Sequence, residues 1–565
     1  MRLIRILLLV QIFLILSVST QNLKAQIIPV GSLEDEQLRL NMLLNDSLNY
    51  SSVNRPFSNI HYQNFIENNR SSDGWWNRRI GNEPILVAPG IKFGIRPPHI
   101  QSTVNSRFPM GENNQAAWYG RGLNNEFSGG FFLTSEYFTI NIHPHIIHHE
   151  NLDYLHPEFI FRDREGKIRY VAEDIEARLD KPFRFGPDPY TTFDWGNSSI
   201  RLHYNNFEAG LSTEPLWWGP ANRYPLIMSN NASGIPHAFI ATRSPLRSKY
   251  AGNFQFKWMV GYPGQSEFYD GAGRNETRFF NAINFAYSLP FYEQLTFGVT
   301  RAYHLYENDG FDIKNVLVII DPLRRTRLVE VQGPDGQRQA RNQIASVYFH
   351  LLLSNANAEI YGEVYREDHS FNFRDLLMQP LHNGAWMLGF QKLIFAPLAD
   401  FYKVNMEITN LTMDQLHQVR PQVFLYTHSQ IRQGHTNRGQ LLGAAIGPGS
   451  SSQFLGIDGY RSDYKYGFFV QRIARNDDFH FRTNPPEISP SQNFGDFFRH
   501  WVDLNVGLNF MYGPGPYYLN AGVIWTKSFN YGRFNYGDLE GINQINYERE
   551  DRTNVQLQVG LRYVF

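Results

Sequence analysis

The sequence of 565 residues contains no cysteine. Disulfide bonds, thiolate metal sites, cysteine nucleophiles and a lipidated N-terminal cysteine are therefore excluded. The formal net charge is only −1, and no basic run is dense enough to attract nucleic acid. Long apolar runs are also missing after residue 25, so no later segment predicts a transmembrane helix.

Common catalytic motifs are missing as well. Ser, His and Asp are abundant, but no Gly-x-Ser-x-Gly elbow occurs. Gly434–Gly443 is rich in glycine, yet no Gly-Lys-Ser/Thr follows, so we interpret it as tightly packed backbone rather than a phosphate loop. The acidic segment Glu173–Asp180 is interpreted as solvated loop. We expect neither an enzyme nor a cofactor.

Aromatic residues, in contrast, are plentiful, at 15% of the chain. Such an excess is typical of the aromatic girdles of membrane barrels, where amphipathic rings lie at headgroup depth. The mean hydropathy of −0.40 resembles that of a soluble protein. In strands that alternate polar and apolar residues, the polar residues offset the apolar ones in such an average, so this value is compatible with a barrel.

Residues 1–25 have the pattern of a secretory signal peptide. Arg2 and Arg5 precede an apolar run, Leu7–Val18, and Ala25 offers a cleavage site. We therefore expect an exported protein. Residues 26–84 do not alternate: Ser32 and three acidic residues suggest a helix start, followed by leucines at helical spacing. They predict a small periplasmic helical segment that packs under or into a barrel, with a flexible leader as the alternative.

From about Val87 the period becomes two, which predicts strands. The last segment places Leu557, Val559 and Leu561 on one face, with polar residues on the other, and ends in aromatic residues. This ending is typical of an outer-membrane barrel, and the alternative is an edge strand of a soluble sandwich. Asn205-Asn206 between two alternating runs predicts a tight hairpin.

Tight turns and long excursions follow one another along residues 85–565, as in outer-membrane barrels with short periplasmic turns and long outer loops. Counting back from the last strand predicts about 18 strands, with Val87–Arg96 as a weak first one. The predicted external excursions are 97–121, 150–197, 212–236, 263–277, 307–345, 366–384, 410–452, 473–500 and 526–553. The predicted fold class is thus an all-β, antiparallel transmembrane barrel.

The predicted inward faces are polar, for example Lys403, Asn405 and Glu407 on one strand and Glu359 and Glu363 on another. A barrel of this size has a lumen too wide for side chains alone to fill. Either water fills it, or loops and the N-terminal segment plug it, and composition does not decide between these.

Three histidines, His143, His145 and His149, share one strand face, and His148 points the other way. Imidazoles at this spacing can hold Zn²⁺. No carboxylate or thiolate completes the site locally, so we interpret them as polar lumen lining and expect no metal. Pro144 predicts a bulge in the same strand.

The external excursions supply the candidate ligand residues. Tryptophan faces stack on the C–H faces of sugars, asparagine amides pair with hydroxyls, and arginine forks onto carboxylates. Packing in a loop core or an interface girdle is an equally good interpretation of the Trp-Trp pair. The candidate glycan-binding residues are Trp217, Trp218, Arg223, Asn230, Asn231, Arg121, Asn124, His435, Asn437 and Arg438.

Several stretches, in this order, resemble the Wzi family of capsule-assembly outer-membrane proteins. They are Trp118–Asn124, Pro182–Gly186, Asp194–Arg201, Gly210–Ser212, Trp217–Pro220, Ser229–His237, Asn342-Gln343, Glu363–Asp368 and Gly434–Gly443. The resemblance implies a barrel with a helical periplasmic section, a lumen blocked by loops, and a lectin-like role in anchoring capsular polysaccharide. The excursion Asp309–Arg341 does not clearly fit the family pattern.

The leading functional hypothesis is therefore a non-enzymatic protein that holds or organises surface polysaccharide. The alternative is an outer-membrane pore for sugars or other small solutes, and a barrel hydrolase is a third, weaker possibility. We expect contact with outer-membrane lipid and lipopolysaccharide, insertion by the barrel-assembly machinery, and a monomer.

Overall fold

A computed structural model describes most of the chain. The described residues are 27–44, 53–58, 74–78, 80, 84–155, 160–162, 168–170, 179–269, 277–306, 316–317, 319, 341–367, 373–414, 422, 424–478, 500–533 and 551–564. The predicted signal peptide, nearly all of Asp309–Arg341 and most of Glu173–Asp180 lie outside them.

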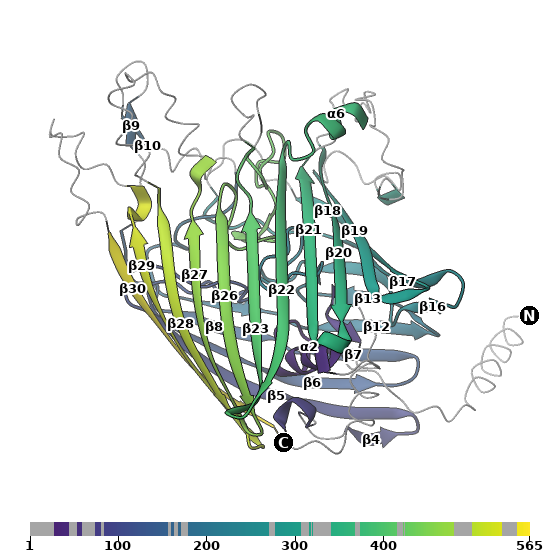
Figure 1. The fold of residues 1–565 in the computed structure, drawn as a ribbon. Helices are drawn as coiled ribbons and strands as arrows, with labels where there is room; N and C mark the ends of the chain where they lie inside the picture. The colour runs from purple at the N-terminus through teal and green to yellow at the C-terminus, as the bar shows by residue number, and fades with distance from the viewer. Residues whose placement is uncertain are drawn as a thin grey trace, which may run out of the picture.

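Within these residues, 18 antiparallel strands close into a barrel (Figure 1). The predicted fold class is confirmed. Several of the strands are interrupted, so the wall consists of more segments than strands. The wall segments are β4 (Ile85–Ala88), β5 (Ile91–Asn105), β6 (Gly122–Thr134), β7 (Phe138–Ile142), β8 (His145–His149), β11 (Tyr190–Asp194), β12 (Ser199–Tyr204), β13 (Phe207–Ser212), β15 (His237–Thr242), β16 (Leu246–Ser248), β17 (Gly252–Gly261), β18 (Arg278–Leu289), β19 (Tyr292–Tyr306), β20 (Arg341–Leu353), β21 (Ala358–Glu367), β22 (Gly384–Ala396), β23 (Ala399–Asn410), β26 (Ser451–Arg461), β27 (Tyr464–Ala474), β28 (Val502–Tyr512), β29 (Tyr517–Phe529) and β30 (Arg552–Tyr563).

The remaining elements are short and lie outside the wall. The helices are α2 (Leu33–Leu44), α6 (Phe373–Met378), η1 (Trp75–Asn77), η3 (Ser354–Ala356) and η6 (Tyr531–Arg533). The short strands are β1 (Ile27–Ile28), β2 (Asn54–Arg55), β3 (Phe57–Ser58), β9 (Ile160–Arg162), β10 (Ile168–Tyr170), β14 (Trp217–Trp218), β24 (Thr436–Asn437) and β25 (Gln440–Leu441). Among the described residues, no helix is long and apolar enough to cross a membrane.

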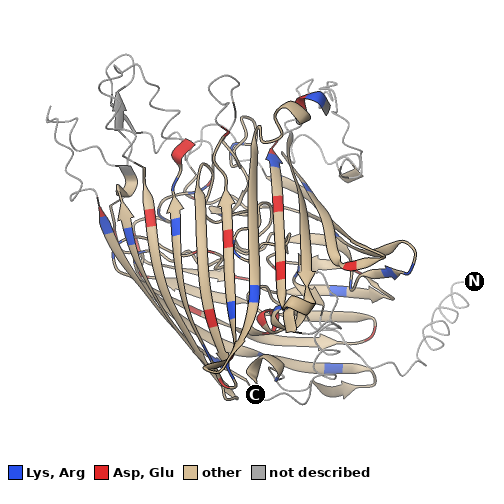
Figure 2. Ribbon diagram, in the orientation of Figure 1, with Lys and Arg blue, Asp and Glu red and all other residues tan. Residues whose placement is uncertain are grey.

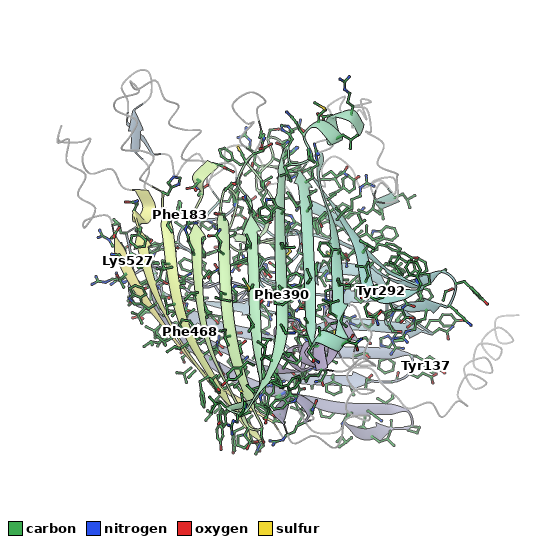
Figure 3. The ribbon with its side chains drawn as sticks, viewed as in Figure 1. Tyr137, Phe183, Tyr292, Phe390, Phe468 and Lys527 are labelled. Atoms are coloured by element: carbon green, nitrogen blue, oxygen red, sulfur yellow. The ribbon has the colours of Figure 1, made fainter. Side chains whose placement is uncertain are left out.

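The barrel closes where β30 pairs with β5, with Leu557 opposite Val104. Leu557, Val559 and Leu561 are 51%, 60% and 38% exposed, so the apolar face of the last strand points outward, as predicted. In Figure 3, Phe468 of β27 is labelled on this wall, and its side chain is 46% exposed. An outward apolar face that closes on itself leaves no sheet edge to meet hydrocarbon.

Short turns gather at one end of the barrel, next to the C-terminus, and the long connections and α6 lie at the other (Figure 1). Asn205 adopts a φ of 53° in the predicted two-residue turn, where Tyr204 pairs with Phe207. Asparagine tolerates this left-handed conformation better than most residues, which explains the turn. The predicted alternation of turns and excursions is confirmed.

Several predicted boundaries were wrong, and the excursions 97–121, 150–197 and 307–345 are all shorter than predicted, because β5 ends at Asn105, β11 begins at Tyr190 and β20 begins at Arg341. The first wall strand is not Val87–Arg96 but β5, which runs on through Pro97 and Pro98 to Asn105. A register shift between Arg96 and His99 absorbs the two prolines, so they do not end the strand. The excursion 150–197 is also too long, because β11 already pairs with β8 from Tyr190. A break at Gly196, whose φ is +54°, divides that strand and hid it from a simple alternation pattern.

Helix α2 confirms the predicted N-terminal helix and its start. The Ser32 hydroxyl accepts a hydrogen bond from the Asp35 backbone N–H at 3.2 Å, which caps the helix. Leu40 and Leu43 pack on wall residues near the short-turn end of the barrel, such as Leu393 and Phe401. Arg562 of β30 donates to both carboxylate oxygens of Glu34, at 2.5 and 3.0 Å. The helix is thereby fixed inside the lower end of the barrel.

Charged residues occur singly along the strands and appear as isolated red and blue bands (Figure 2). Glu407 is 1% exposed, whereas its neighbours Met406 and Ile408 are 47% and 43% exposed. Glu359 and Glu363 are likewise buried at inward positions. The predicted polar inner face is confirmed, and it is covered by protein rather than lining an open lumen.

The covering is a plug, which we define as residues 53–58, 106–121, 213–236 and 424–450. The apolar residues of its segments 213–236 and 424–450 form one core with inward wall residues such as Phe239, Phe280 and Tyr361. The strands β14 and β2 pair inside it, Trp217 opposite Arg55. Of the two alternatives that the sequence left open, loops that plug the lumen are therefore the correct one.

Candidate functional site

Buried glutamates on the wall hold the plug. Both carboxylate oxygens of Glu407 accept hydrogen bonds from consecutive plug N–H groups, those of Asn222 at 2.8 Å, Arg223 at 3.1 Å and Tyr224 at 2.9 Å. Glu363 accepts from the Leu226 N–H at 3.1 Å. These bonds satisfy loop backbone that would otherwise be buried without partners.

The Trp-Trp pair belongs to the plug core. Trp218 is 0% exposed and packs in the central cluster. Trp217 is 4% exposed, donates from its ring nitrogen to the Ala221 carbonyl, and lies under the Arg55 guanidinium at 4.7 Å. Side chains buried to this extent present no ring face to a ligand. Of the two interpretations left open for the pair, we assign loop-core packing.

His435 and Asn437, in the glycine-rich stretch, are also fully buried. His435 is hydrogen-bonded to the Ile227 carbonyl at 2.6 Å and to the His304 ring at 2.9 Å. Burial lowers the pKa of His435 to about 4, so it is neutral at physiological pH. Asn437 donates to the Ser233 carbonyl at 2.9 Å. The stretch forms the small β24–β25 hairpin, in agreement with the predicted tight packing.

Three further candidates fix loops near the rim. Asn124, 1% exposed, donates to the Gly120 carbonyl and contacts the His149 ring. Arg121 donates to the carbonyls of Ser106 and Asp153 and so links two outer loops. Arg438 is 48% exposed and pairs with Asp194 at 3.0 Å. Asn230 is 5% exposed and lies deeper, on the side of the plug that faces the N-terminal segment.

A cavity of about 420 Å³ lies between the plug, the outer loops and strands β27–β30, and we call it the outer cavity. Phe183, which lines it, is labelled in Figure 3 near the end of the barrel from which the long loops leave. Its aromatic lining residues are Phe108, Trp118, Tyr119, Tyr154, Phe183, Phe424, Phe469, Trp501 and Tyr531. Its main polar lining residues are Glu112, Asn114, Lys181, Arg223, Asn231, Gln440, Gln471, Arg475, Asn476, Asp503, Asn505, Thr526, Gln556 and Gln558.

The aromatic rings form an ordered cluster on one side of the outer cavity. Tyr531 stacks on Phe108 with ring centroids 4.7 Å apart, and Trp501 meets Tyr531 edge-on at 5.2 Å. The Trp501 ring nitrogen donates to Asp503 at 3.0 Å, and Asp503 is ion-paired with Arg475 at 2.8 Å. Trp501 and Trp118 are only partly buried. Trp118 meets Phe185 edge-on at 5.2 Å, so both tryptophans are held in place while each residue keeps some accessible surface, as stacking on a ligand requires.

Polar side chains form a continuous hydrogen-bonded row beside this cluster, on the inner faces of β27–β29. Gln471 donates to the Tyr224 hydroxyl at 2.6 Å, Asn505 donates to Gln471 at 3.2 Å, and Thr526 donates to Asn505 at 2.8 Å. The Tyr224 hydroxyl donates in turn to Glu112. Amides and hydroxyls held in this way can both donate to and accept from sugar hydroxyls.

Two of the sequence candidates, Arg223 and Asn231, reach the outer cavity. The Arg223 guanidinium lies 4.2 Å from the Phe454 ring centroid and 3.4 Å from Glu112. Burial opposes its charge, but Tyr224 and Glu112 raise its pKa, so Arg223 is a cation. Asn231 donates to the Leu441 carbonyl and accepts from the Asn113 N–H, which joins three plug segments.

Sequence reasoning did not single out Trp118, Trp501 or Arg475 as ligand residues. Trp118 lies in a stretch that carries the family resemblance, and the alternation pattern places Trp501 at the start of a wall strand. Trp118 lies hundreds of positions before Arg475 and Trp501 in the sequence. Only closure of the barrel brings these residues to one cavity, so no local sequence pattern predicts the site.

The inward histidines His143 and His145 lie close to one another and, through His145, to a carboxylate. The His145 Nδ1 lies 3.1 Å from Glu126, and the His143 and His145 ring centroids are 5.5 Å apart. No group of three metal-ligating side chains occurs within the described ranges. Asp180, expected in a solvated loop, is instead 0% exposed and accepts from the Ser266 N–H at 2.8 Å. That part of the prediction for Glu173–Asp180 was wrong, because the carboxylate fastens one outer loop to another.

Comparisons with known proteins fit this architecture. The structure of Wzi from Escherichia coli, described as an outer membrane protein involved in group 1 capsule assembly and as a carbohydrate-binding β-barrel, superimposes with a TM-score of 0.57 at 11% identity, over 96% of this chain and 100% of that one. OprD from Pseudomonas aeruginosa gives a TM-score of 0.38 at 8% identity, over 83% and 92% of the two chains. OccK5 (OpdH) from the same organism gives 0.36 at 9%, over 84% and 98%. The last two scores are too low to bear on function.

No curated protein matches the sequence. The profile of the family described as "Capsule assembly protein Wzi" matches residues 95–478, which is more than half of the chain and includes the plug from residue 106 onward. The protein is an outer-membrane β-barrel, and it belongs to the Wzi family of capsule assembly proteins.

Proposed function

We propose that the protein binds capsular or other surface polysaccharide in the outer cavity and holds it at the cell surface without chemical turnover. Membership of the capsule-assembly family supports the biological setting. The E. coli relative is described as carbohydrate-binding, which supports the ligand class. The observation that carries the proposal is the pairing of fixed, partly exposed tryptophans with a row of amides in one cavity.

The chemistry of the cavity matches that of sugars. A pyranose ring has C–H faces that stack on aromatic rings and hydroxyls at its rim that donate and accept. The outer cavity, at about 420 Å³, falls within the usual range of small-molecule sites, roughly 300–1,000 Å³. Arg223 and Arg475 add positive charge for acidic sugars.

The plug argues against the alternative of a solute pore. Its core is continuous with the wall, and wall glutamates bind its backbone. A pore needs an open, hydrated path, whereas buried side chains occupy the lumen along the described plug. Planar bilayer recordings of the intact protein should therefore show almost no conductance.

The outer face of the barrel supports a position in the lipid of the outer membrane. Exposed apolar residues such as Leu508, Leu557 and Val559 would contact outer-membrane lipid and lipopolysaccharide. Cleavage of the signal peptide near Ala25, insertion by the barrel-assembly machinery and a monomeric state belong to the same proposal.

The decisive test measures binding of bacterial polysaccharides to detergent-purified, full-length protein on a glycan array. Trp118→Ala and Trp501→Ala should each weaken binding by about 1 kcal/mol or more, roughly five-fold or greater. Trp195→Ala is the matched control, because Trp195 is 54% exposed and does not line the cavity.

A deletion strain supplies the cellular test. Loss of the protein should release polysaccharide into the medium. A strain that keeps all of its capsule attached, together with purified protein that binds no polysaccharide, would contradict the proposal. Turnover of ester or lipid substrates would instead favour the hydrolase alternative.

A further inference from the structure

The apolar core of the plug does not pack evenly around the barrel wall. The wall residues of that core come from strands between β15 and β22 and from β27, for example Phe239, Tyr361 and Ile473. No described residue of β28, β29, β30, β5 or β6 belongs to it. Glu363 and Glu407, which bind the plug backbone, lie on β21 and β23. The core is therefore anchored on one side of the lumen.

Two cavities lie on the other side, along the strands drawn in yellow in Figure 1. The outer cavity reaches Asp503 and Asn505 of β28. A second cavity, of about 430 Å³, reaches Asn509 and Met511 on the same strand, and we call it the inner cavity. Together the two cavities follow β28 from its second residue to its next-to-last. The inner cavity ends against residues 29–34, at the short-turn end of the barrel.

The wall beside the inner cavity is polar and leaves space. Gln101 of β5, Asn520 of β29 and Gln558 of β30 line this cavity and are only partly buried. A Cβ added at Gly522 of β29 would meet no atom closer than 3.7 Å. Side-chain amides can both donate to and accept from water, so this strip of wall suits a hydrated path.

One layer of side chains separates the two cavities. Asn114, Tyr119 and Gln558 line both of them. The Tyr119 hydroxyl accepts a hydrogen bond from Gln101 at 2.5 Å and donates one to Glu126 at 3.2 Å. Gln101 and Glu126 are paired across β5 and β6. The Tyr119 side chain thus extends from the plug to the wall at the point where the cavities meet.

Tyr119 is held by fewer contacts than the residues of the plug core. Among the described residues, its cluster holds only two other buried apolar side chains, those of Ala117 and Ile147. Its attachment to the wall consists of the two hydrogen bonds of its hydroxyl. Rotation of this one side chain would join the cavities and would leave the core around Trp218 intact.

We propose that the outer and inner cavities form a closed conduit for water and small inorganic ions along β28–β30, and that the Tyr119 side chain is its gate. This activity goes beyond polysaccharide binding and does not depend on it. The structure shows the closed state, in which Tyr119 is 4% exposed. That state agrees with the very low conductance expected of the intact protein.

The test is planar bilayer recording of detergent-purified, full-length variants in potassium chloride. Tyr119→Ala removes the ring and its hydrogen bonds and joins the cavities, so conductance should rise roughly ten-fold or more over the wild type. Tyr119→Phe keeps the ring but loses both hydrogen bonds, so it should conduct in brief openings and less than Tyr119→Ala.

Tyr348→Ala is the matched control. Tyr348 is also 4% exposed and points inward, and its hydroxyl donates to Asn284 at 2.7 Å. It lines neither cavity. Its loss should therefore leave conductance at the wild-type level.

A cysteine placed in the inner cavity shows where the current flows. The chain contains no cysteine, so Asn520→Cys supplies a single thiol. In the double variant with Tyr119→Ala, a charged methanethiosulfonate reagent should reduce the conductance by half or more. The same reagent should have no effect on Tyr119→Ala alone.

Several outcomes would overturn the proposal. They are equal conductance of Tyr119→Ala and the wild type, equal conductance of Tyr119→Ala and Tyr348→Ala, and a current that modification of Asn520→Cys leaves unchanged. Heat-resistant migration checks that each variant is folded, and if Tyr119→Ala does not fold, the same measurements on Tyr119→Phe decide. Polysaccharide binding is measured separately on the glycan array, so failure of one proposal is distinguishable from failure of the other.

Discussion

The plug core and the outer cavity are built from similar residue types and differ in how deeply those residues are buried. In the plug core, Trp218, His435 and Asn437 are fully buried, and His435 and Asn437 are bonded to other parts of the plug. In the outer cavity, Trp118 and Trp501 are held in place with part of their rings accessible. Tryptophan, asparagine and arginine therefore indicate a glycan site only where packing leaves them a free face.

The largest effect is expected from Glu407→Ala, which removes a wall carboxylate that binds the plug backbone. Three plug N–H groups lose their acceptor, and each unsatisfied buried group costs roughly 1–3 kcal/mol. The plug should loosen, and planar bilayer recordings should show conductance that the wild-type protein lacks.

Glu267→Ala is the control for this variant, because Glu267 is exposed on an outer loop. Conductance should stay near zero in the control. A Glu407→Ala barrel that shows no conductance and keeps the stability of the wild type would show that the wall carboxylates do not hold the plug.

Trp218→Ala should come next and should affect stability rather than ligand binding directly. Removal of a fully buried tryptophan costs about 3–5 kcal/mol, because the core cannot close around the cavity that is left. Denaturant unfolding of detergent-purified protein measures this. Trp195→Ala should change stability far less, since its ring is 54% exposed. Equal stabilities of the two variants would contradict the assignment of Trp218 to the core.

The barrel could be predicted from sequence because its signal is local and repeated. Alternation and turn length are properties of neighbouring residues, so Leu557 and Val559 indicate an outward face on their own. The prediction failed where geometry interrupts the repeat. The bulge at Pro97-Pro98 and the break at Gly196 hid parts of β5 and β11.

The site could not be predicted to the same degree, because ring stacking and burial depend on distant partners. Trp217-Trp218 is conspicuous in sequence, yet its burial depends on a plug that draws on four separate segments. Trp501 is inconspicuous, yet Tyr531 and Asp503 place it at the outer cavity.

Helix α2 offers a smaller, pH-dependent test. Burial alone would raise the pKa of Glu36, but Lys465 at 2.8 Å and Lys403 at 3.8 Å lower it to about 2, from an ordinary value of 4.5. Because the folded pKa is the lower one, the stabilisation is complete above pH 4.5 and is lost as the pH falls towards 2. A depression of this size corresponds to on the order of 3 kcal/mol.

Glu36→Gln should remove part of the dependence of stability on pH, because the neutral amide cannot titrate. Unfolding midpoints measured between pH 2 and 6 for both proteins check the prediction. The wild type should lose stability more steeply than Glu36→Gln as the pH falls, and parallel curves would show that the ion pairs at the helix contribute nothing.

The smallest effect is expected from Asp503→Asn, which tests whether the outer cavity is pre-organised. The amide oxygen can still accept from the Trp501 ring nitrogen, but the ion pair with Arg475 is lost. A part-exposed pair of this kind contributes about 1 kcal/mol or less to folding, so stability should hardly change. Polysaccharide affinity should fall two- to five-fold, because the amide at position 503 is no longer anchored by Arg475, so it holds the Trp501 ring less firmly and binding must order the ring. Direct stacking predicts that Trp501→Phe keeps more affinity than Trp501→Ala. If Asp503→Asn binds polysaccharide as tightly as the wild type while Trp501→Ala does not, the Trp501 ring contributes to binding and its support by Asp503 does not.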